Sequence, residues 1–335
     1  MTDIQKIARL FEQFSSLKVL IIGDVMIDSY IWGDVDRISP EAPVPIVQVN
    51  KRANRLGGAA NVALNIKALG AEPIICSVIG DDIQSATFLD LLDKENITTE
   101  GIVKSKNRIT TTKFRVIGNN AQMLRVDEEM NESLVVEDQN LFFERIKYIL
   151  QHSKIDVVIF QDYDKGVICK PIIDRIQTLI NSTIPIAVDP KRRNFFNYSS
   201  VDLFKPNLKE LQEAINSHFD KKDTQKLTEE IETLQKKLNV KYLFTTLSDQ
   251  GVYISENSNG NFKSSLIPAH VRSIADVSGA GDTVISVASL CLALKTDKKI
   301  LAELSNLAGG LVCEEAGVIP VNKEKLLKET LKIYG

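Results

Sequence analysis

The segment at 276–284 carries residue types that can bind an anion and move a proton; its sequence is Asp-Val-Ser-Gly-Ala-Gly-Asp-Thr-Val. Its Gly-Ala-Gly turn precedes an apolar stretch at 284–294 that is expected to be helical. Unpaired N–H groups and the positive end of the helix dipole attract anions at such a turn. Asp282 is then placed to deprotonate a hydroxyl while the amides hold developing phosphoryl charge. The residues alone leave a second interpretation open, in which the glycines only make a tight turn and Asp282 caps the helix.

Two further carboxylates, Asp24 and Asp28, follow the first apolar run of the chain at 18–23. Open α/β sheets present ligands at the carboxyl ends of their strands, so these side chains can accept hydrogen bonds from sugar hydroxyls. Acidic residues also stabilise loops through local hydrogen bonds, and this alternative stays open.

The pair Gly57-Gly58 comes before a helical pattern at 59–69 that contains Asn61. Paired glycines permit a close approach of ligand to backbone, and they can serve as a hinge or only as a helix cap. The Asn61 side chain can both donate to and accept from a polyol.

Asn207 and Glu210 begin another helical pattern after Pro206. One interpretation is a capping box, in which each side chain satisfies the other residue's backbone N–H. The other is that both hold hydrated Mg²⁺ and nucleotide phosphates, because Mg²⁺ prefers a few protein oxygens together with water and phosphate.

The elements that must position these residues alternate between short apolar runs and amphipathic stretches. This alternation predicts a mostly parallel sheet with helices on both faces. The expected strands are 18–23, 73–79, 156–160, 184–188 and 242–245. The expected helices are 59–69, 83–94, 134–151, 171–181, 208–217, 224–238, 281–294 and 299–316, with a short terminal helix from Asn322.

Two regions interrupt this rhythm, at 29–49 and 110–126. Alternating β-formers and the prolines Pro40, Pro43 and Pro45 predict antiparallel strands outside the main sheet. We expect them to form a small β lid over the ligand edge. No composition break marks a domain boundary, so 1–335 is expected to be one domain.

The composition is that of an ordinary globular protein, with 335 residues, 44% hydrophobic and 25% charged. A formal charge of −3 gives no basic field, so neither nucleic acid nor membrane is an expected partner. Four scattered cysteines, no N-terminal signal and no apolar run long enough to span a bilayer together favour a cytoplasmic location. Three separated histidines indicate no metal cluster.

Taken together, the motifs Gly23-Asp24, Gly57-Gly58, Asn207-x-x-Glu210 and Gly279-Ala-Gly-Asp282 resemble the ribokinase-like (PfkB) family of sugar kinases. The similarity runs from about residue 18 to residue 317. It implies a ribokinase-like α/β fold with a mostly parallel central sheet, flanking helices and a small β lid. It also implies ATP and Mg²⁺, and leaves open a requirement for a monovalent cation. By contrast, a nicotinamide-dependent oxidoreductase would need Gly-x-Gly-x-x-Gly after the first strand, where this chain has Gly-Asp-Val-Met.

The resemblance assigns roles residue by residue. It implies that Asp282 is the base and that the amides of Gly279, Ala280 and Gly281 form the anion hole. On the nucleotide side it implies Asn207, Glu210, Ser248, Gly251 and Asn306, with Glu210 holding the metal indirectly through water. Facing the sugar it implies Asp28, Gly57, Gly58 and Asn61.

Within that family, segments at 37–45, 111–115, 162–166 and 188–191 are similar to the D-glycero-D-manno-heptose 7-phosphate 1-kinases. This similarity implies phosphorylation of the anomeric hydroxyl to a 1,7-bisphosphate for ADP-heptose and lipopolysaccharide core synthesis. The alternative is another sugar or sugar phosphate. Arg115 and Lys191 are the expected ligands of the substrate's phosphate. We expect a stand-alone kinase that forms a homodimer through its lid, with Ile31, Trp32, Val44, Ile46 and Val116 as the apolar members.

Overall fold

The computed structural model describes residues 3–180, 182–270, 272–315 and 317–334. Nine strands within these ranges form a central sheet. In spatial order they are β13 (Asn261–Ile267), β12 (Val252–Ser258), β11 (Tyr242–Thr246), β10 (Leu203–Phe204), β9 (Ile186–Asp189), β8 (Val157–Gln161), β1 (Lys18–Gly23), β4 (Glu72–Gly80) and β5 (Ile102–Ser105). The strands from β11 to β5 pair in parallel, and β12 and β13 add an antiparallel edge.

Both faces of this sheet are buried, as the strand β1 illustrates. Val19 and Ile21 belong to one hydrophobic core, and the alternate residues Leu20 and Ile22 belong to the other. Successive side chains of a strand point to opposite faces, so a continuous apolar run such as 19–22 needs cover on both sides.

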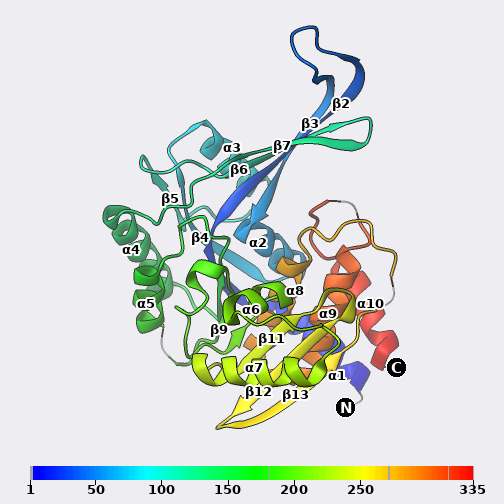
Figure 1. Cartoon of the computed structure of the whole chain (residues 1–335). Helices are drawn as coiled ribbons and strands as arrows, with labels where there is room; N and C mark the ends of the chain where they lie inside the picture. The colour runs from blue at the N-terminus through cyan, green and yellow to red at the C-terminus, as the bar shows by residue number, and fades with distance from the viewer. Residues whose placement is uncertain (1–2, 181, 271, 316, 335) are drawn as a thin grey trace.

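Helices supply that cover in two layers (Figure 1). The core that contains Val19 is closed by α1 (Asp3–Gln13), the short η1 (Phe14–Ser16), α2 (Ala59–Ala68), α3 (Ile83–Lys94), α8 (Ala280–Ala293), α9 (Lys298–Val312) and α10 (Lys323–Tyr334). The core that contains Leu20 is closed by α4 (Val136–His152), α5 (Lys170–Leu179), α6 (Leu208–Ile215) and α7 (Thr224–Leu238). Two more short helices, η2 (Arg192–Asn194) and η3 (Ser248–Gln250), follow β9 and β11.

Four strands form a second sheet, which we call the outer sheet. Its spatial order is β3 (Pro45–Gly58), β2 (Val25–Ile38), β6 (Thr112–Gly118) and β7 (Ala121–Glu128). β2 pairs antiparallel with β3 and parallel with β6, and β7 returns antiparallel beside β6. In Figure 1 the ribbon of β2 and β3 extends well beyond the body of the molecule. Every residue of β7 is exposed, so this edge of the outer sheet is uncovered in the single chain.

The mostly parallel α/β architecture predicted from the sequence is confirmed. Several bounds are also confirmed without change, including β1, α3 and α7. The expected strand region at 29–49 was too short, because β2 already begins at Val25 and β3 continues to Gly58. Asp28 therefore lies within a strand of the outer sheet and not in a loop after β1.

Other elements were not anticipated: the helix α1, the strands β5 and β10, and the antiparallel strands β12 and β13. In α1 the buried residues Ile7, Leu10 and Phe11 have helical spacing, a pattern that is visible in the sequence. The predicted helix ends at Asn181 and Ala316 lie outside the described residues. No helix in the described ranges has both the length and the apolar character needed to cross a membrane.

Candidate active site

A cavity of about 310 Å³ lies between the outer sheet and the carboxyl ends of the central strands. Its lining comes from β2, β3, β6 and β7, from the loop after β8, and from the start of α8. The lining residues are Met26, Asp28, Gly57, Gly58, Lys113, Arg115, Arg125, Tyr163, Lys165, Ser278, Gly279, Asp282 and Val318. Residues from separate segments that the sequence marked for sugar binding and for catalysis thus share one cavity.

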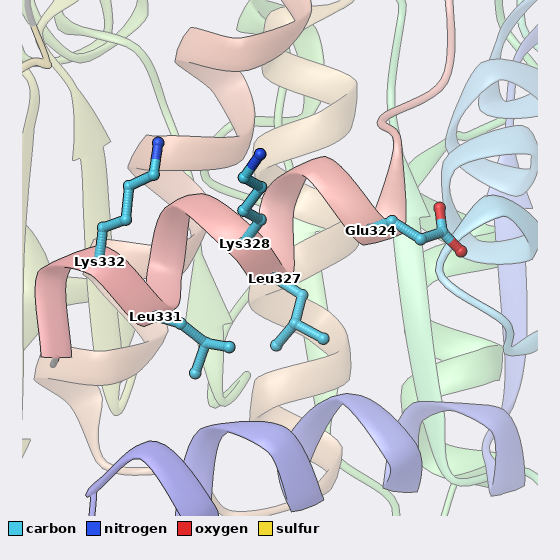
Figure 2. Close-up of a pocket in the computed structure, with 5 residues that line it drawn as sticks. All are labelled: Glu324, Leu327, Lys328, Leu331 and Lys332. Carbon is cyan, nitrogen blue, oxygen red and sulfur yellow. The ribbon is translucent and has the colours of Figure 1, made fainter.

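A second depression, of about 420 Å³, lies on α10 and is lined by Glu324, Leu327, Lys328, Leu331 and Lys332. Figure 2 shows its two leucines pointing toward α1, while the lysines point away from it. The groove has the apolar floor of a helix–helix contact and none of the predicted site residues lines it. Its chemistry does not resemble that of a kinase site, so the smaller cavity is the candidate active site.

Asp282 lies in the first turn of α8 with only 6% of its surface exposed. Its Oδ2 accepts a hydrogen bond from Asn61 Nδ2 at 2.7 Å. Its Oδ1 accepts from the Tyr163 hydroxyl at 2.6 Å and from Gln161 Nε2 at 3.2 Å. Burial raises the pKa of Asp282 to about 6, although the hydrogen bonds from Tyr163 and Asn61 act in the opposite direction. The carboxyl group is therefore a base suited to neutral pH.

The turn at 276–281, which we call the glycine turn, is shaped by Asp276. Its two carboxylate oxygens accept the N–H of Ser278 at 2.9 Å and of Gly317 at 3.0 Å. Gly279 is the N-cap of α8 with a φ of 81°, a left-handed conformation that favours glycine. The Ala280 N–H donates to the Val277 carbonyl at 3.3 Å. Among the described residues, the N–H groups of Gly279 and Gly281 have no protein acceptor, so they are available to an anion.

A buried chain of polar groups connects Asp282 to a lysine. Gln161 Nε2 lies 3.2 Å from Asp189 as well as from Asp282, and Asp189 forms a 2.9 Å ion pair with Lys205. The Lys205 side chain is only 3% exposed. Its Nζ lies 3.8 Å from the point where a Cβ of Gly281 would be, so a positive charge stands beside the glycine turn.

The Asp28 side chain on β2 lies against Gly57 on β3, whose partner in the strand register is Met26. A Cβ on Gly57 would lie 2.3 Å from Asp28 Oδ2, so only glycine permits this approach. Asp28 Oδ1 accepts from Arg115 Nη1 at 2.6 Å. Gly58, the N-cap of α2, and Asn61 follow directly, but Asn61 is fully buried and its amide holds Asp282. The structure thus gives Asn61 a contact with the expected base, while its contact with a sugar stays a prediction.

Four cations line the outer part of the cavity: Lys113, Arg115, Arg125 and Lys165. Each is paired with a carboxylate of the outer sheet or of the segment that follows it. Lys113 bonds Asp127 at 3.1 Å and Glu129 at 2.8 Å, Lys165 bonds Glu129 at 2.8 Å, and Arg125 bonds Asp127 at 2.7 and 2.8 Å. The guanidinium of Arg125 lowers the pKa of Asp127 to about 2.

The residues expected on the nucleotide side gather at the carboxyl end of β11. A β-bridge places Asn207 beside Thr246, and Ser248 and Gly251 form the turn that follows. Asn306 Nδ2, on α9, donates to the Pro268 carbonyl at 2.8 Å, and Gly251 packs against the same segment. The roles of these residues toward a nucleotide stay predictions.

Asn207 and Glu210 form a complete capping box at the start of α6, with both reciprocal hydrogen bonds at 2.9 Å. The local-structure interpretation of this motif is thus realised. The remaining Glu210 oxygen, Oε1, accepts from Lys191 Nζ. Lys191 also lies 5.8 Å from the ring of Tyr163, which puts it between the cavity and Glu210. Lys191 does not line the cavity itself, and its contact with a sugar phosphate stays a prediction.

Four residues at the site carried no role in the analysis of the sequence: Tyr163, Gln161, Lys205 and Asp276. Gln161 is the last residue of β8, Tyr163 comes two residues later, and Lys205 follows β10, so their place at strand ends was a usable signal. Asp24 shows the opposite case. It is 1% exposed and holds three backbone N–H groups of the loop at 163–167, so its role is the structural one.

Comparison with known proteins identifies the family of the chain. The family model described as pfkB family carbohydrate kinase matches residues 16–325. "Bifunctional protein HldE" of Helicobacter pylori (strain J99) is 36% identical over 312 residues, covering 92% of this chain and 65% of that protein. "Bifunctional protein HldE" of Koribacter versatilis (strain Ellin345) is 38% identical over 310 residues, covering 92% of this chain and 62% of that protein. The chain thus spans less than two thirds of the length of these relatives.

Solved structures share the fold at low identity. Phosphofructokinase-2 from Escherichia coli in complex with potassium superposes with a TM-score of 0.77 and 18% identity, over 95% of this chain and 98% of that one. Ribokinase from Arabidopsis thaliana complexed with ribose and ATP superposes with a TM-score of 0.70 and 15% identity, over 93% of this chain and 99% of that one. With a family model that covers most of its length, the chain belongs to the pfkB family of carbohydrate kinases.

Proposed function

We propose that this chain transfers the γ-phosphate of ATP to the anomeric hydroxyl of D-glycero-D-manno-heptose 7-phosphate. The product would be the 1,7-bisphosphate, a precursor of ADP-heptose for the lipopolysaccharide core. The observation that carries the proposal is the cavity itself, because it joins the buried base Asp282 to four cations on the outer sheet and the loop after β8. A sugar with its phosphate at the end opposite the reacting hydroxyl would place that hydroxyl near Asp282 and the phosphate near the four cations.

The residues of the inner half support the transfer step. Asp282 would take the proton of the anomeric hydroxyl, and the oxygen would then form a bond to the γ-phosphorus. The bond from that phosphorus to the β–γ bridging oxygen would break, and ADP would leave with the electron pair. The free N–H groups of Gly279 and Gly281, with the Lys205 ammonium beside them, would stabilise the negative charge on the transferred group.

The outer half would recognise the phosphate of the substrate. Lys113 and Arg115 on β6, Arg125 on β7 and Lys165 after β8 converge there from three segments. They are already partnered by Asp28, Asp127 and Glu129, so a dianionic phosphate would have to displace carboxylates. The Arg125–Asp127 pair is 46% and 28% exposed, and pairs near the surface are weak, so a phosphate that offers Arg a bidentate partner can replace Asp127 there.

Asn207, Glu210, Ser248, Gly251 and Asn306 would face the nucleotide. Among the described residues, no three or more His, Cys, Asp or Glu side chains are grouped to hold a metal ion. Both Glu210 oxygens are already bonded, to Asn207 and to Lys191. These residues fit a hydrated Mg²⁺ held mainly by nucleotide phosphates, with Glu210 as an indirect ligand through water. When bound, that ion would neutralise phosphate charge.

The outer sheet would act as a lid and as a dimer contact, and the location would be the cytoplasm. Exposed apolar side chains on β7 support the contact: Met123, Leu124 and Val126 are 43%, 56% and 44% exposed. A sheet face and edge of this kind need cover, which a second copy of the same sheet can supply.

The test is a substrate screen with the purified chain. ATP is offered with heptose 7-phosphate, with the unphosphorylated heptose and with other sugar phosphates, and phosphorus NMR identifies the position of the new phosphate. We expect the 1,7-bisphosphate with the first substrate. Equal activity on the unphosphorylated sugar, or transfer to another hydroxyl, would reject the heptose phosphate and favour another sugar kinase of this fold.

A further inference from the structure

The hydroxyl of Tyr163 makes the shortest of the hydrogen bonds to Asp282, at 2.6 Å against 2.7 Å for Asn61 and 3.2 Å for Gln161. Tyr163 belongs to the loop that follows β8 and it lines the cavity. Burial and the nearby Asp282 carboxylate raise the pKa of the Tyr163 phenol well above its usual range. The phenol therefore keeps its proton and acts as a donor to the carboxylate.

Several hydrogen bonds from buried side chains hold the loop at 162–167 in place. The buried Asp24 carboxylate accepts the N–H groups of Tyr163 at 2.8 Å, Lys165 at 3.2 Å and Val167 at 3.0 Å. Arg108 donates to the Lys165 carbonyl. Asp164 has a φ of 56°, a left-handed conformation that Asp adopts more readily than most residues other than glycine. A loop constrained in this way fixes the position of the Tyr163 ring.

The other end of the same loop is anchored by Asp162. Its Oδ1 accepts the N–H of Asp164 at 2.8 Å, and its Oδ2 accepts from Asn194 at 2.9 Å and from Tyr198 at 3.1 Å. Tyr163 therefore has a buried anchor on each side of it in the sequence. Such support is what a precisely oriented side chain needs.

The two carboxylate oxygens of Asp282 accept unequal numbers of hydrogen bonds. Oδ1 receives two, from Tyr163 and Gln161, while Oδ2 receives only the one from Asn61. Since a carboxylate oxygen has two lone pairs, Oδ1 is filled and Oδ2 keeps one lone pair for a new donor. A substrate hydroxyl would meet the base at Oδ2.

We propose that Tyr163 is a positioning residue for Asp282, which fills Oδ1 and so directs Oδ2 toward the hydroxyl that is phosphorylated. The inference depends on the proposed function, because it takes Asp282 as the base. Tyr163 itself neither gives nor takes a proton in the reaction. Its hydroxyl stabilises the ionised carboxylate and restricts its rotation.

The groups that shift the pKa of Asp282 come from four parts of the chain. Asp189 on β9 raises the pKa of Asp282, whereas Lys205 after β10 and the hydrogen bonds from Tyr163 and Asn61 lower it. Loss of the Tyr163 hydroxyl removes a group that lowers this pKa and leaves the others unchanged. The sign of the expected shift is therefore upward.

The first experiment replaces one hydroxyl, as Tyr163→Phe. We expect kcat to fall by ~10-fold to ~100-fold, the range for a hydrogen bond to a charged group. The KM for ATP should stay unchanged, and the acid limb of kcat/KM should move to higher pH by about one unit. A kcat within about twofold of the original with an unmoved limb would refute the proposal, as would a change confined to the KM of the sugar.

The matched control is Tyr253→Phe, which also removes one tyrosine hydroxyl, from a ring that is 2% exposed. Its hydroxyl lies 2.7 Å from that of Thr228 on α7 and it does not contact the cavity. We expect kcat and the acid limb to stay unchanged in this variant. Loss of activity equal to that of Tyr163→Phe would show that any buried hydroxyl gives the effect, and the proposal would fail.

A second substitution covers the case in which Tyr163→Phe does not fold. Incorporation of 3-fluorotyrosine at position 163 keeps the ring and makes the phenol a stronger donor. The acid limb should then move to lower pH, opposite to its shift in Tyr163→Phe. A role limited to packing would leave the limb in place, and that result would refute the proposal.

Failure of the inference can be told apart from failure of the proposed function by Asp282→Asn. If this variant keeps its activity, Asp282 is not the base and both fail. If Asp282→Asn is inactive while the Tyr163 variants behave like the original chain, only the positioning role is lost.

Discussion

The glycine turn and the outer sheet both present charged groups to one cavity, but they hold those groups in different ways. Beside the glycine turn, Asp282 and Lys205 are 6% and 3% exposed and have buried side-chain partners. On the outer sheet, Arg125 and Asp127 are 46% and 28% exposed and pair with each other. Buried partners are costly to separate, while pairs near the surface contribute little and exchange easily. The first region can hold a reacting group still, and the second can accept a charged ligand.

The largest effect is expected from Asp282→Asn, which removes the base from the buried region. Asparagine keeps the shape but cannot take a proton, so kcat should fall by ~10²-fold to ~10⁴-fold while ATP binding is largely retained. Steady-state kinetics and isothermal titration with ATP would measure the two quantities. Asp223→Asn is the control, because the Asp223 carboxylate caps α7 and does not line the cavity, whereas no side chain caps α8. Retention of more than about a tenth of kcat by Asp282→Asn would remove the base role.

Next in size is the stability effect of Asp24→Asn. Three backbone N–H groups point at this buried carboxylate, and burial raises its pKa while those hydrogen bonds lower it. An amide would direct N–H at N–H, so we expect a loss of about 2–3 kcal/mol in the free energy of unfolding. Urea denaturation would measure it. Asp156→Asn, where a carboxylate oxygen accepts the single N–H of Lys18 at 2.9 Å, should cost less than about 1 kcal/mol. Equal losses in both variants would contradict this account of Asp24.

The two residues expected to bind the substrate's phosphate should affect binding and not turnover. Arg115→Ala and Lys191→Ala are each expected to raise the KM for the phosphosugar at least ~10-fold, or about 1.4 kcal/mol, with a smaller change for ATP. Arg115 lines the cavity and bonds Asp28, whereas Lys191 bonds Glu210. If Lys191→Ala raised only the KM for ATP, Lys191 would be assigned to the nucleotide side instead. Unchanged KM values in both variants would contradict a phosphate site.

The acid dependence of activity should report on the buried region. Asp282 must be ionised to accept a proton, and its pKa is raised to about 6. Since the protonated form increases as pH falls, kcat/KM should drop about tenfold per unit below pH ~6. The phosphate of a sugar phosphate also titrates near pH 6. The Tyr163 variants distinguish the two ionisations, because a substitution in the protein can shift the pKa of Asp282 but not the pKa of the substrate. A rate independent of pH down to 5 would contradict Asp282 as the base.

The smallest effect on catalysis is expected from the exposed edge of the outer sheet. Leu124→Asp should convert a dimer into a monomer at micromolar concentration, as measured by light scattering, because a charge replaces an apolar contact. Leu141→Asp is the control, since Leu141 is 53% exposed on α4, away from the outer sheet. A monomeric original chain would count against the dimer contact.

Much of the architecture could be predicted from local patterns. The run at 18–23 is short, apolar at every inner position and ends in glycine, which favours a strand buried on both faces, and 224–238 has the spacing of a one-sided helix. The edge strands β12 and β13 were harder to predict from the sequence, because their solvent-facing positions are polar and their pairing is set by neighbours in space.

The sequence by itself determined which groups could do chemistry: a glycine turn beside Asp282, a glycine pair at 57–58 and a capped helix at Asn207. These are short motifs whose geometry depends on adjacent residues. Only the tertiary structure decided the partners of each group. Asn61, Gln161 and Tyr163 reach Asp282 across more than a hundred residues of chain, and Asp24 turns inward to a loop instead of toward a ligand. Such pairings follow from the order of the strands in the sheet, which brings distant carboxyl ends to one edge and which no local pattern encodes.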